Sequence, residues 1–272
     1  MFIETHAHLN DKAFDADRDA VLDKCRAAGV DKLVEIACAA GEWGAGEKLA
    51  AARQGAVFCA FGLHPENIED AGPRQLAELP AWLEKKCCVA LGEIGLDYWW
   101  KPEKKTEQLR LLAELLPLSV KFSKPVVFHT RNGRDLKTGN AYFELAQELK
   151  DWTFNNKKKA RGVLHCFSGG WEDAKAALDL GLLLGINGTF TYKNNGPLRE
   201  IVKKAGLENI VLETDCPYLS VQSMRGKRND PSYIPEIARA AAEYLNIKVE
   251  ALAVATTANA VELFFRNCKN LP

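Results

Sequence analysis

The sequence predicts an α/β protein that folds as one (β/α)8 TIM barrel, a single domain over residues 1–272. Short apolar runs rich in β-branched residues alternate with longer amphipathic stretches, which is typical of parallel strands joined by helices. Eight such units fit the usual barrel size of about 250 residues. No linker or change of composition divides the chain, so we expect one domain. A doubly wound open sheet is the alternative.

The strands are predicted where a short apolar run is bounded by polar or turn-forming residues. Eight segments meet this description: Phe2–Thr5, Lys32–Ile36, Val57–Phe61, Val89–Leu91, Pro125–Phe128, Gly162–Leu164, Leu182–Ile186 and Ile210–Leu212. Their regular spacing leaves room for one crossover helix after each strand.

The helices are predicted where apolar residues recur with helical spacing. Seven lie between the strands, and two more follow the last strand: Asp17–Ala28, Glu47–Gln54, Gln75–Lys86, Thr106–Phe122, Tyr142–Leu149, Glu172–Leu180, Leu198–Ala205, Ser232–Leu245 and Val249–Phe265.

The composition limits the class of protein. Hydrophobic residues make up 47% and charged residues 26%, which is ordinary for a soluble domain and excludes wholesale disorder. The 36 basic and 36 acidic residues balance, so anion binding needs a local basic patch. The eight cysteines form no C-x-x-C pair and favour free thiols. Without a signal-peptide pattern or a membrane-length apolar run, we expect a cytoplasmic protein that contacts no membrane and has no obligate protein partner.

All five histidines lie at or just after the carboxyl end of a predicted strand: His6, His8, His64, His129 and His165. Side chains alternate along a strand, so His6 and His8 point the same way, and Glu4 lies on that face below them. Glu93 and Asp215 also follow strands. Barrel enzymes build their active sites at this face, and mixed imidazole and carboxylate groups are typical metal ligands. Each residue alone is more often structural; the joint pattern favours a metal site.

The number of candidate ligands indicates how many ions bind. One catalytic ion usually takes three protein ligands and a water. Six groups suit two divalent ions that share a bridge, with Zn²⁺, Mn²⁺ or Mg²⁺ as candidates: His6, His8, Glu93, His129, His165 and Asp215.

Seven short motifs occur in one order along the whole chain. They are ETHAHL at 4–9, GLHP at 62–65, GEIGLDY at 92–98, PVVFH at 125–129, HCFSG at 165–169, ETDCPYL at 213–219 and RGKRN at 225–229. In these motifs, and in TTANA at 256–260, the chain resembles the TatD family of metal-dependent deoxyribonucleases, a branch of the amidohydrolase-like barrels.

The resemblance implies a role for each ligand. His6, His8 and Asp215 would bind the first ion, and Glu93 would bridge the two. His129 and His165 would bind the second ion. His64 would lie beside the site and contact the substrate phosphate.

Three positions depart from the family pattern. Glu4, Asn10 and Asn132 stand where an acidic residue is usual in the family, aspartate in the first two cases. None removes a proposed ligand, but asparagine cannot act as a carboxylate base, so the groups around the site and the proton transfers are open.

We expect hydrolysis of phosphodiester bonds in DNA, with RNA as a further substrate, at strand ends or in single strands. Asp215, Glu93 and His64 are the candidate catalytic residues, with Asp215 accepting a proton from water. Substrate contacts are predicted for His64 and for the basic loop residues Arg225, Lys227 and Arg228. The aromatic run Tyr98, Trp99 and Trp100 after Glu93 would stack bases, with Tyr98 as the named candidate, and packing in the core is the alternative. The alternatives are an amide or ester hydrolase such as a D-aminoacyl-tRNA deacylase, and a non-catalytic binding protein.

Overall fold

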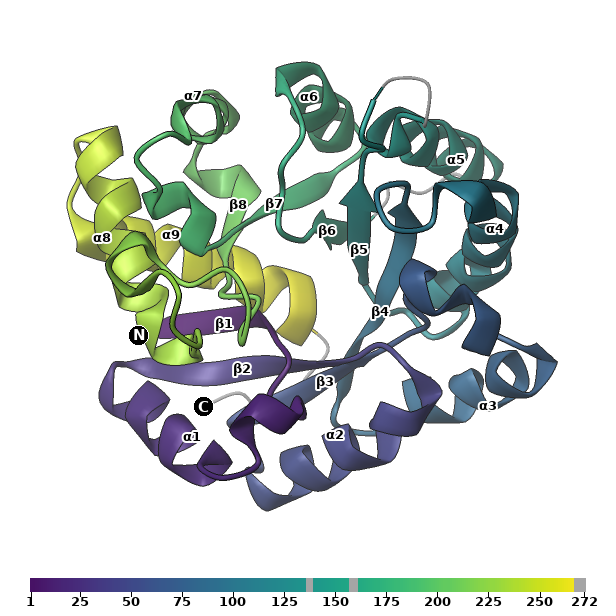
Figure 1. Ribbon diagram of the computed structural model, residues 1–272, viewed down its shortest axis with the longest axis horizontal. Coiled ribbons are helices and arrows are strands. Elements are labelled where there is room, and N and C mark those ends of the chain that lie inside the picture. The colour runs from purple at the N-terminus through teal and green to yellow at the C-terminus, as the bar shows by residue number, and fades with distance from the viewer. Residues whose placement is uncertain (136–138, 157–160, 267–272) are drawn as a thin grey trace.

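The computed structural model describes residues 1–135, 139–156 and 161–266. Eight parallel strands pair in chain order and form one ring in the centre of the molecule (Figure 1). They are β1 (Phe2–Ala7), β2 (Val30–Ala37), β3 (Val57–Phe61), β4 (Cys88–Asp97), β5 (Val126–Arg131), β6 (Gly162–Leu164), β7 (Leu182–Ile186) and β8 (Ile210–Leu212). The predicted barrel is confirmed, and the open sheet is not formed.

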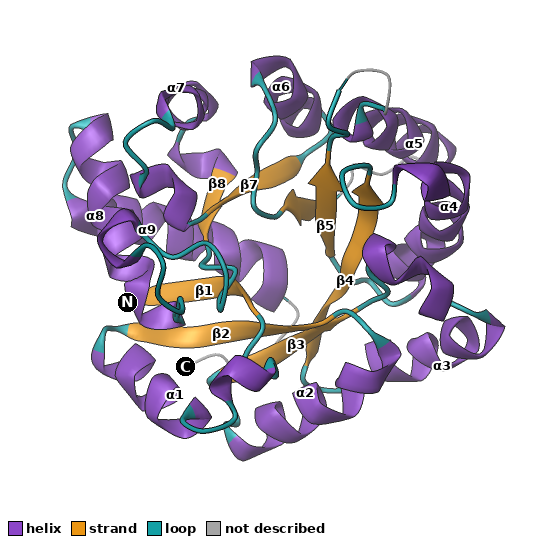
Figure 2. Ribbon diagram, viewed as in Figure 1, coloured by secondary structure: helices purple, strands orange, loops and turns teal. Residues whose placement is uncertain are grey.

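The helices form an outer ring around the strands (Figure 2). Within the described residues they are α1 (Arg18–Ala27), α2 (Ala40–Ala52), α3 (Pro73–Leu83), α4 (Lys105–Lys121), α5 (Ala141–Asn156), α6 (Trp171–Asp179), α7 (Gly196–Ala205), α8 (Ile234–Leu245) and α9 (Val249–Ala260). None of these described helices is both long enough and apolar enough to cross a membrane.

The ring closes where β1 meets the end of β8. Ala7 pairs with Cys216 in an isolated parallel bridge, and the Thr5 hydroxyl donates to the Leu212 carbonyl at 3.0 Å. The Asp215 amide donates to the His6 carbonyl at 2.9 Å. These bonds carry the site residues of the first and last strands to the same rim.

The barrel interior is filled from its amino-terminal end. Apolar side chains from the strands pack there against Leu263, Phe264 and Phe265. These three residues belong to a π-helical turn, Val261–Phe265, which follows α9 directly where the sequence predicts one continuous helix. Because this end is filled, the functional site lies at the carboxyl ends of the strands.

Several elements extend further than predicted, among them α5, which runs to Asn156 rather than Leu149, and β5, which runs to Arg131 rather than Phe128. Strand β4 continues past Gly92 and Glu93 to Asp97, which pairs with Arg131 of β5. The apolar pattern stops at Leu91, so the sequence shows only the first half of the strand. Helix α2 starts at Ala40 rather than Glu47. The sequence did not predict its first two turns because Gly41, Gly44 and Gly46 have low helix propensity.

Candidate metal centre

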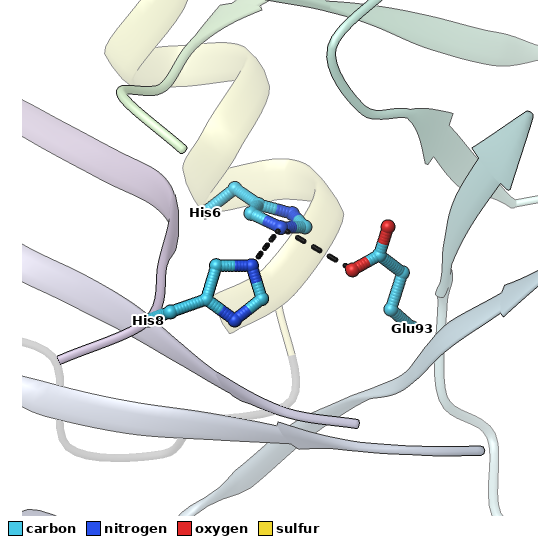
Figure 3. Close-up of side chains that lie close together, drawn as sticks. All are labelled: His6, His8 and Glu93. Atoms are coloured by element: carbon cyan, nitrogen blue, oxygen red, sulfur yellow. Dashed lines mark hydrogen bonds and ion pairs between the residues drawn. The ribbon is translucent and has the colours of Figure 1, made fainter. Parts of the chain in front are cut away.

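His6 and His8 lie at the end of β1 with their imidazole rings on one side of the strand. Their Nε2 atoms are 3.2 Å apart, and His6 Nε2 lies 3.5 Å from Glu93 Oε2 (Figure 3). Two nitrogens and a carboxylate oxygen thus face one point, because the strand period of two turns both imidazoles inward.

Glu93 of β4 lies among four imidazoles and is almost completely buried. Its Oε1 atom lies 2.6 Å from His165 Nε2, 2.9 Å from His129 Nδ1 and 3.6 Å from His64 Nε2. Its Oε2 atom faces His6. One carboxylate therefore faces His6 with one oxygen and His129 and His165 with the other. A ligand that bridges two ions needs this arrangement.

Asp215 follows β8 and completes the group around β1. Its Oδ1 atom lies 3.4 Å from His8 Nε2 and 3.6 Å from His6 Nε2. The backbone of Asp215 is left-handed (φ 59°), a conformation that costs a non-glycine residue roughly 1–3 kcal/mol. This turn directs the carboxylate into the barrel instead of along the strand.

The protonation of the centre follows from burial and from its neighbours. Burial lowers the pKa of His6 to about 4, with help from the nearby His165. Burial alone would raise the pKa of Glu93, but His165, His64 and His6 hold it well below its usual range. Burial opposes charge on His8 as well, but Asp215 raises the pKa of His8 to about 9. Without an ion, a negative Glu93 thus lies beside a neutral His6 and a protonated His8.

Two histidines are oriented by groups outside the candidate ligand set. His129 Nε2 lies 2.8 Å from Asp97 Oδ2, which leaves Nδ1 facing Glu93 and His165. The Glu66 amide donates to His64 Nδ1 at 3.1 Å. In neutral His64 the proton is therefore on Nε2, which faces the centre, so this ring presents a hydrogen-bond donor rather than a metal-binding lone pair.

The six candidate ligands fit a metal centre. Two groups of three donors each lie within 4.8 Å of one another, His6 with His8 and Glu93, and His6 with His165 and Asp215. His129 Nδ1 and His165 Nε2 are also only 3.3 Å apart. Facing imidazole nitrogens need a proton or a cation between them, and a mixed imidazole and carboxylate donor set suits divalent ions.

The centre lies in a cavity of about 910 Å³ at the carboxyl ends of the strands. His8, His64, Glu93, His129, His165 and Asp215 line it, and so do Trp100, Arg131, Tyr192 and Tyr218. The cavity is wide enough for a substrate larger than one phosphate group.

The prediction for Tyr98 is wrong. Its side chain is completely buried, and its hydroxyl donates to Glu144 Oε2 at 2.9 Å. It cannot stack on a base. Trp100, two residues later, is 52% exposed and lines the cavity instead.

The basic loop after β8 reaches the cavity only in part. Arg225 lies over the ring of Tyr192, a cavity residue, at 4.4 Å from its centroid. Arg228 binds both carboxylate oxygens of Asp17, at 2.8 and 2.7 Å, and does not line the cavity. Lys227 is exposed outside the cavity wall. Arg228 is therefore paired with Asp17 rather than directed into the cavity, and the phosphate contact of Lys227 stays a prediction.

The three departures from the family pattern take structural positions. Glu4 is buried and accepts the His6 and Thr214 amides, and burial raises its pKa to about 8. Asn10 lines the cavity, and its backbone N–H donates to Glu35 Oε1. Asn132 Oδ1 accepts the Tyr142 amide.

Asp97 is the most important residue that our sequence analysis did not assign. It follows Glu93 by four residues on the same strand, so the alternation of side chains already places both on one face. That spacing could have revealed its role next to His129.

A parallel barrel with histidines and carboxylates gathered at its carboxyl-terminal rim defines the class of metal-dependent hydrolases. The family model described as TatD related DNase matches residues 3–265, so the chain belongs to the TatD family.

Similar proteins cover nearly the whole chain. YabD of Bacillus subtilis (strain 168), named a metal-dependent hydrolase, is 29% identical over 97% of this chain and 99% of its own. The 3'-5' ssDNA/RNA exonuclease TatD of Pantoea ananatis (strain LMG 20103) is 32% identical over 94% and 96%. The crystal structure of YjjV, a TatD homologue from Escherichia coli K12, matches with a TM-score of 0.87 at 30% identity, covering 97% of each chain.

Proposed function

We propose that this metal-dependent hydrolase cleaves phosphodiester bonds in single-stranded DNA, and in RNA, with two divalent ions at the barrel rim. The observation that supports the proposal is the position of Glu93, a negative carboxylate that faces imidazoles of both halves of the site. The Pantoea relative whose name states single-stranded DNA and RNA as substrates supports the choice of substrate.

His6, His8 and Asp215 would hold one ion, His129 and His165 the other, and Glu93 would bind both. Bound at this place, two divalent ions lower the pKa of water and neutralise the negative charge of a phosphodiester. Mg²⁺, Mn²⁺ and Zn²⁺ are the candidates, and the histidine-rich donor set favours Mn²⁺ and Zn²⁺.

The protein residues supply position and proton transfer. Burial opposes the negative charge of Asp215, but His8 and the other imidazoles hold the pKa of Asp215 below its usual value. Asp215 is therefore ionised and can accept a proton from water. His64 presents Nε2–H to the centre and can donate a hydrogen bond to a phosphate oxygen. The buried Glu93 keeps the histidines at fixed separations.

The experiment compares substrates and metals side by side. Single-stranded DNA, duplex DNA, RNA, D-aminoacyl-tRNA and a dihydropyrimidine amide are assayed with Mg²⁺, Mn²⁺ and Zn²⁺ and with a chelator. We expect turnover of the single strands, none in chelator, and about two ions per chain by elemental analysis. Turnover restricted to the amide or to D-aminoacyl-tRNA would overturn the proposal.

A variant provides the second test. We expect the double substitution His6→Ala and His8→Ala to abolish hydrolysis while circular dichroism still shows the barrel fold. The substitution Tyr244→Ala on the outer face of α8 is the control and keeps full activity. Hydrolysis that survives the double substitution would show that these histidines do not form the centre.

A further inference from the structure

The loop that follows β4 carries two tryptophans at the mouth of the cavity. Asp97 Oδ1 accepts the backbone amides of Trp99 and Trp100, at 2.9 and 2.7 Å. Gln108 of α4 binds both the amide and the carbonyl of Asp97 and also the carbonyl of Lys101. The backbone of the loop is therefore held at both ends, which places the two tryptophans at the mouth of the cavity.

Arg131 lies over both of these indole rings, and Arg134 lies over that of Trp99 as well. Its guanidinium carbon is 4.9 Å from the ring centroid of Trp99 and 5.6 Å from that of Trp100. Arg131 follows His129 by two residues on β5, so both side chains leave the strand on the same face. We call Trp99, Trp100 and Arg131 the aromatic platform.

Arg131 brings a permanent positive charge to the cavity wall. Among the described residues that line the cavity, it is the single lysine or arginine, whereas Asp11, Glu35, Glu42 and Glu66 are acidic. No ion pair of its guanidinium is found among the described residues; it lies over the rings of Trp99 and Trp100, and its charge lowers the pKa of the nearby Glu66, which burial raises. A buried or paired arginine would contribute little, but this one can bind a phosphate.

The platform has a fixed position relative to the metal centre. Asp97 holds the tryptophan amides through Oδ1 and His129 through Oδ2. Trp100, Arg131 and His129 line the same cavity. A strand with a phosphate at the centre would therefore meet the platform with a neighbouring nucleotide.

We propose that the aromatic platform binds the nucleotide next to the cleaved linkage, with its base on Trp100 and its phosphate at Arg131. This inference rests on the proposed function and names the feature that selects the substrate. Base stacking on an exposed aromatic ring requires a base that is free of a duplex, so the platform favours single strands. It also favours polynucleotides over small phosphate esters that have no base.

The test uses oligothymidylates with one abasic position that is moved along the strand. In the wild-type protein, one abasic position lowers kcat/KM by about 5- to 100-fold, the usual range for one stacked base. Trp100→Ala causes a loss of the same size on the intact strand and no further loss at that abasic position. Trp100→Phe restores most of the activity, which a loss through misfolding would not allow.

The controls separate the platform from the chemistry. Phe143→Ala removes another exposed aromatic side chain, and Arg239→Ala another exposed arginine; both keep wild-type kinetics. Arg131→Ala raises KM and weakens the dependence of KM on salt, while Arg131→Lys retains part of the binding. In chelator, octathymidylate quenches the tryptophan fluorescence of the wild-type protein but much less that of Trp100→Ala.

Two results are informative in different ways. If the wild-type protein cleaves the single strand and Trp100→Ala cleaves it equally well, the platform inference is overturned and the proposed function stands. If the wild-type protein cleaves no nucleic acid in any metal, the proposed function fails, and the inference fails with it.

Discussion

Asp97 illustrates how one buried carboxylate can hold two parts of a site. Its two oxygens bind different groups, the tryptophan amides and the His129 ring, and its side chain is fully buried. Burial opposes its charge, but His129 keeps the pKa of Asp97 below its usual value. Such a carboxylate fixes both the orientation and the tautomer of a metal-binding histidine.

The substitution Asp97→Asn tests this orientation. The amide group would donate to His129 Nε2, so that the ring proton moves to Nδ1, the atom that faces Glu93. We expect metal affinity to fall about 10- to 100-fold. Competition with a chelating dye measures the affinity, and Asp70→Asn on an exposed turn is the control. An unchanged affinity would show that Asp97 does not position His129.

Glu35 of β2 is a second buried carboxyl, and it makes stability depend on pH. Its oxygens accept the amides of Leu9 and Asn10, at 2.7 and 3.0 Å, and burial raises its pKa from 4.5 to about 7. The unfolded chain loses this proton near pH 4.5, whereas the folded chain keeps it up to about pH 7. The free energy of unfolding therefore falls with rising pH in this window, by about 1.4 kcal/mol per pH unit.

The substitution Glu35→Gln removes this titration. We expect the free energy of unfolding of the wild-type protein, relative to that of the variant, to fall by roughly 3 kcal/mol between the unfolded and folded pKa values of Glu35. Above the folded pKa, the two free energies should change with pH in parallel. Urea unfolding of both proteins in chelator at pH 5, 6, 7 and 8 provides the measurement. Curves that run parallel throughout would exclude a raised pKa for Glu35.

At the scale of elements, the pairing of β4 with β5 positions the centre of the site. Glu93 and Asp97 come from β4, and His129 and Arg131 come from β5. Between them Gly95 pairs with His129 in a backbone conformation at φ 146°, and a Cβ there would collide with the His129 carbonyl oxygen. Only glycine allows these two strands to approach so closely.

The substitution Gly95→Ala should therefore separate the two strands. We expect a loss of more than about 2 kcal/mol of stability, because both the collision and the unfavourable φ must be accommodated. Gly41→Ala is the control: nothing lies within 4 Å of its Cβ position in the first turn of α2, and alanine favours helix over glycine by up to about 1 kcal/mol. In thermal unfolding, Gly95→Ala should lower Tm and Gly41→Ala should raise it. Equal changes of Tm in the two variants would contradict the close approach of β4 and β5.

At the scale of the whole molecule, the candidate ligands connect distant parts of the chain. They come from β1, β4, β5, β6 and β8, between positions 6 and 215, and they meet at one rim. The ring itself closes through only a few bonds between β1 and β8. Ions bound at the rim would therefore stabilise the closed barrel as a whole.

Metal binding should be measurable as thermal stability. At a free Mn²⁺ or Zn²⁺ concentration 100 times Kd, we expect about 2.7 kcal/mol of stabilisation, or roughly 5–10 °C in Tm. The shift should disappear in chelator and in the His6→Ala, His8→Ala double variant. A Tm that rises equally in that variant would place the ions elsewhere.

The barrel and the six candidate ligands could be predicted from the sequence because both depend on local patterns. Alternation of apolar strands and amphipathic helices predicts parallel strands, and parallel strands bring their carboxyl ends to one rim. Every histidine therefore belongs to the same region before any distance is known. The extents of β4 and α2 were not predictable, because backbone pairing and packing extend both elements through residues of weak propensity.

Only the tertiary structure decided what each side chain near the rim contacts. Tyr98 and Trp100 are both aromatic residues directly after the end of β4, and no sequence pattern distinguishes them. Tyr98 is buried against Glu144, however, whereas Trp100 lines the cavity. Arg131 ends β5 and Arg228 lies on the loop after β8, and both are arginines near the rim, yet Arg228 is paired with Asp17 while Arg131 lies over two indoles. Burial and pairing depend on residues far away in the chain, so local sequence patterns cannot determine them.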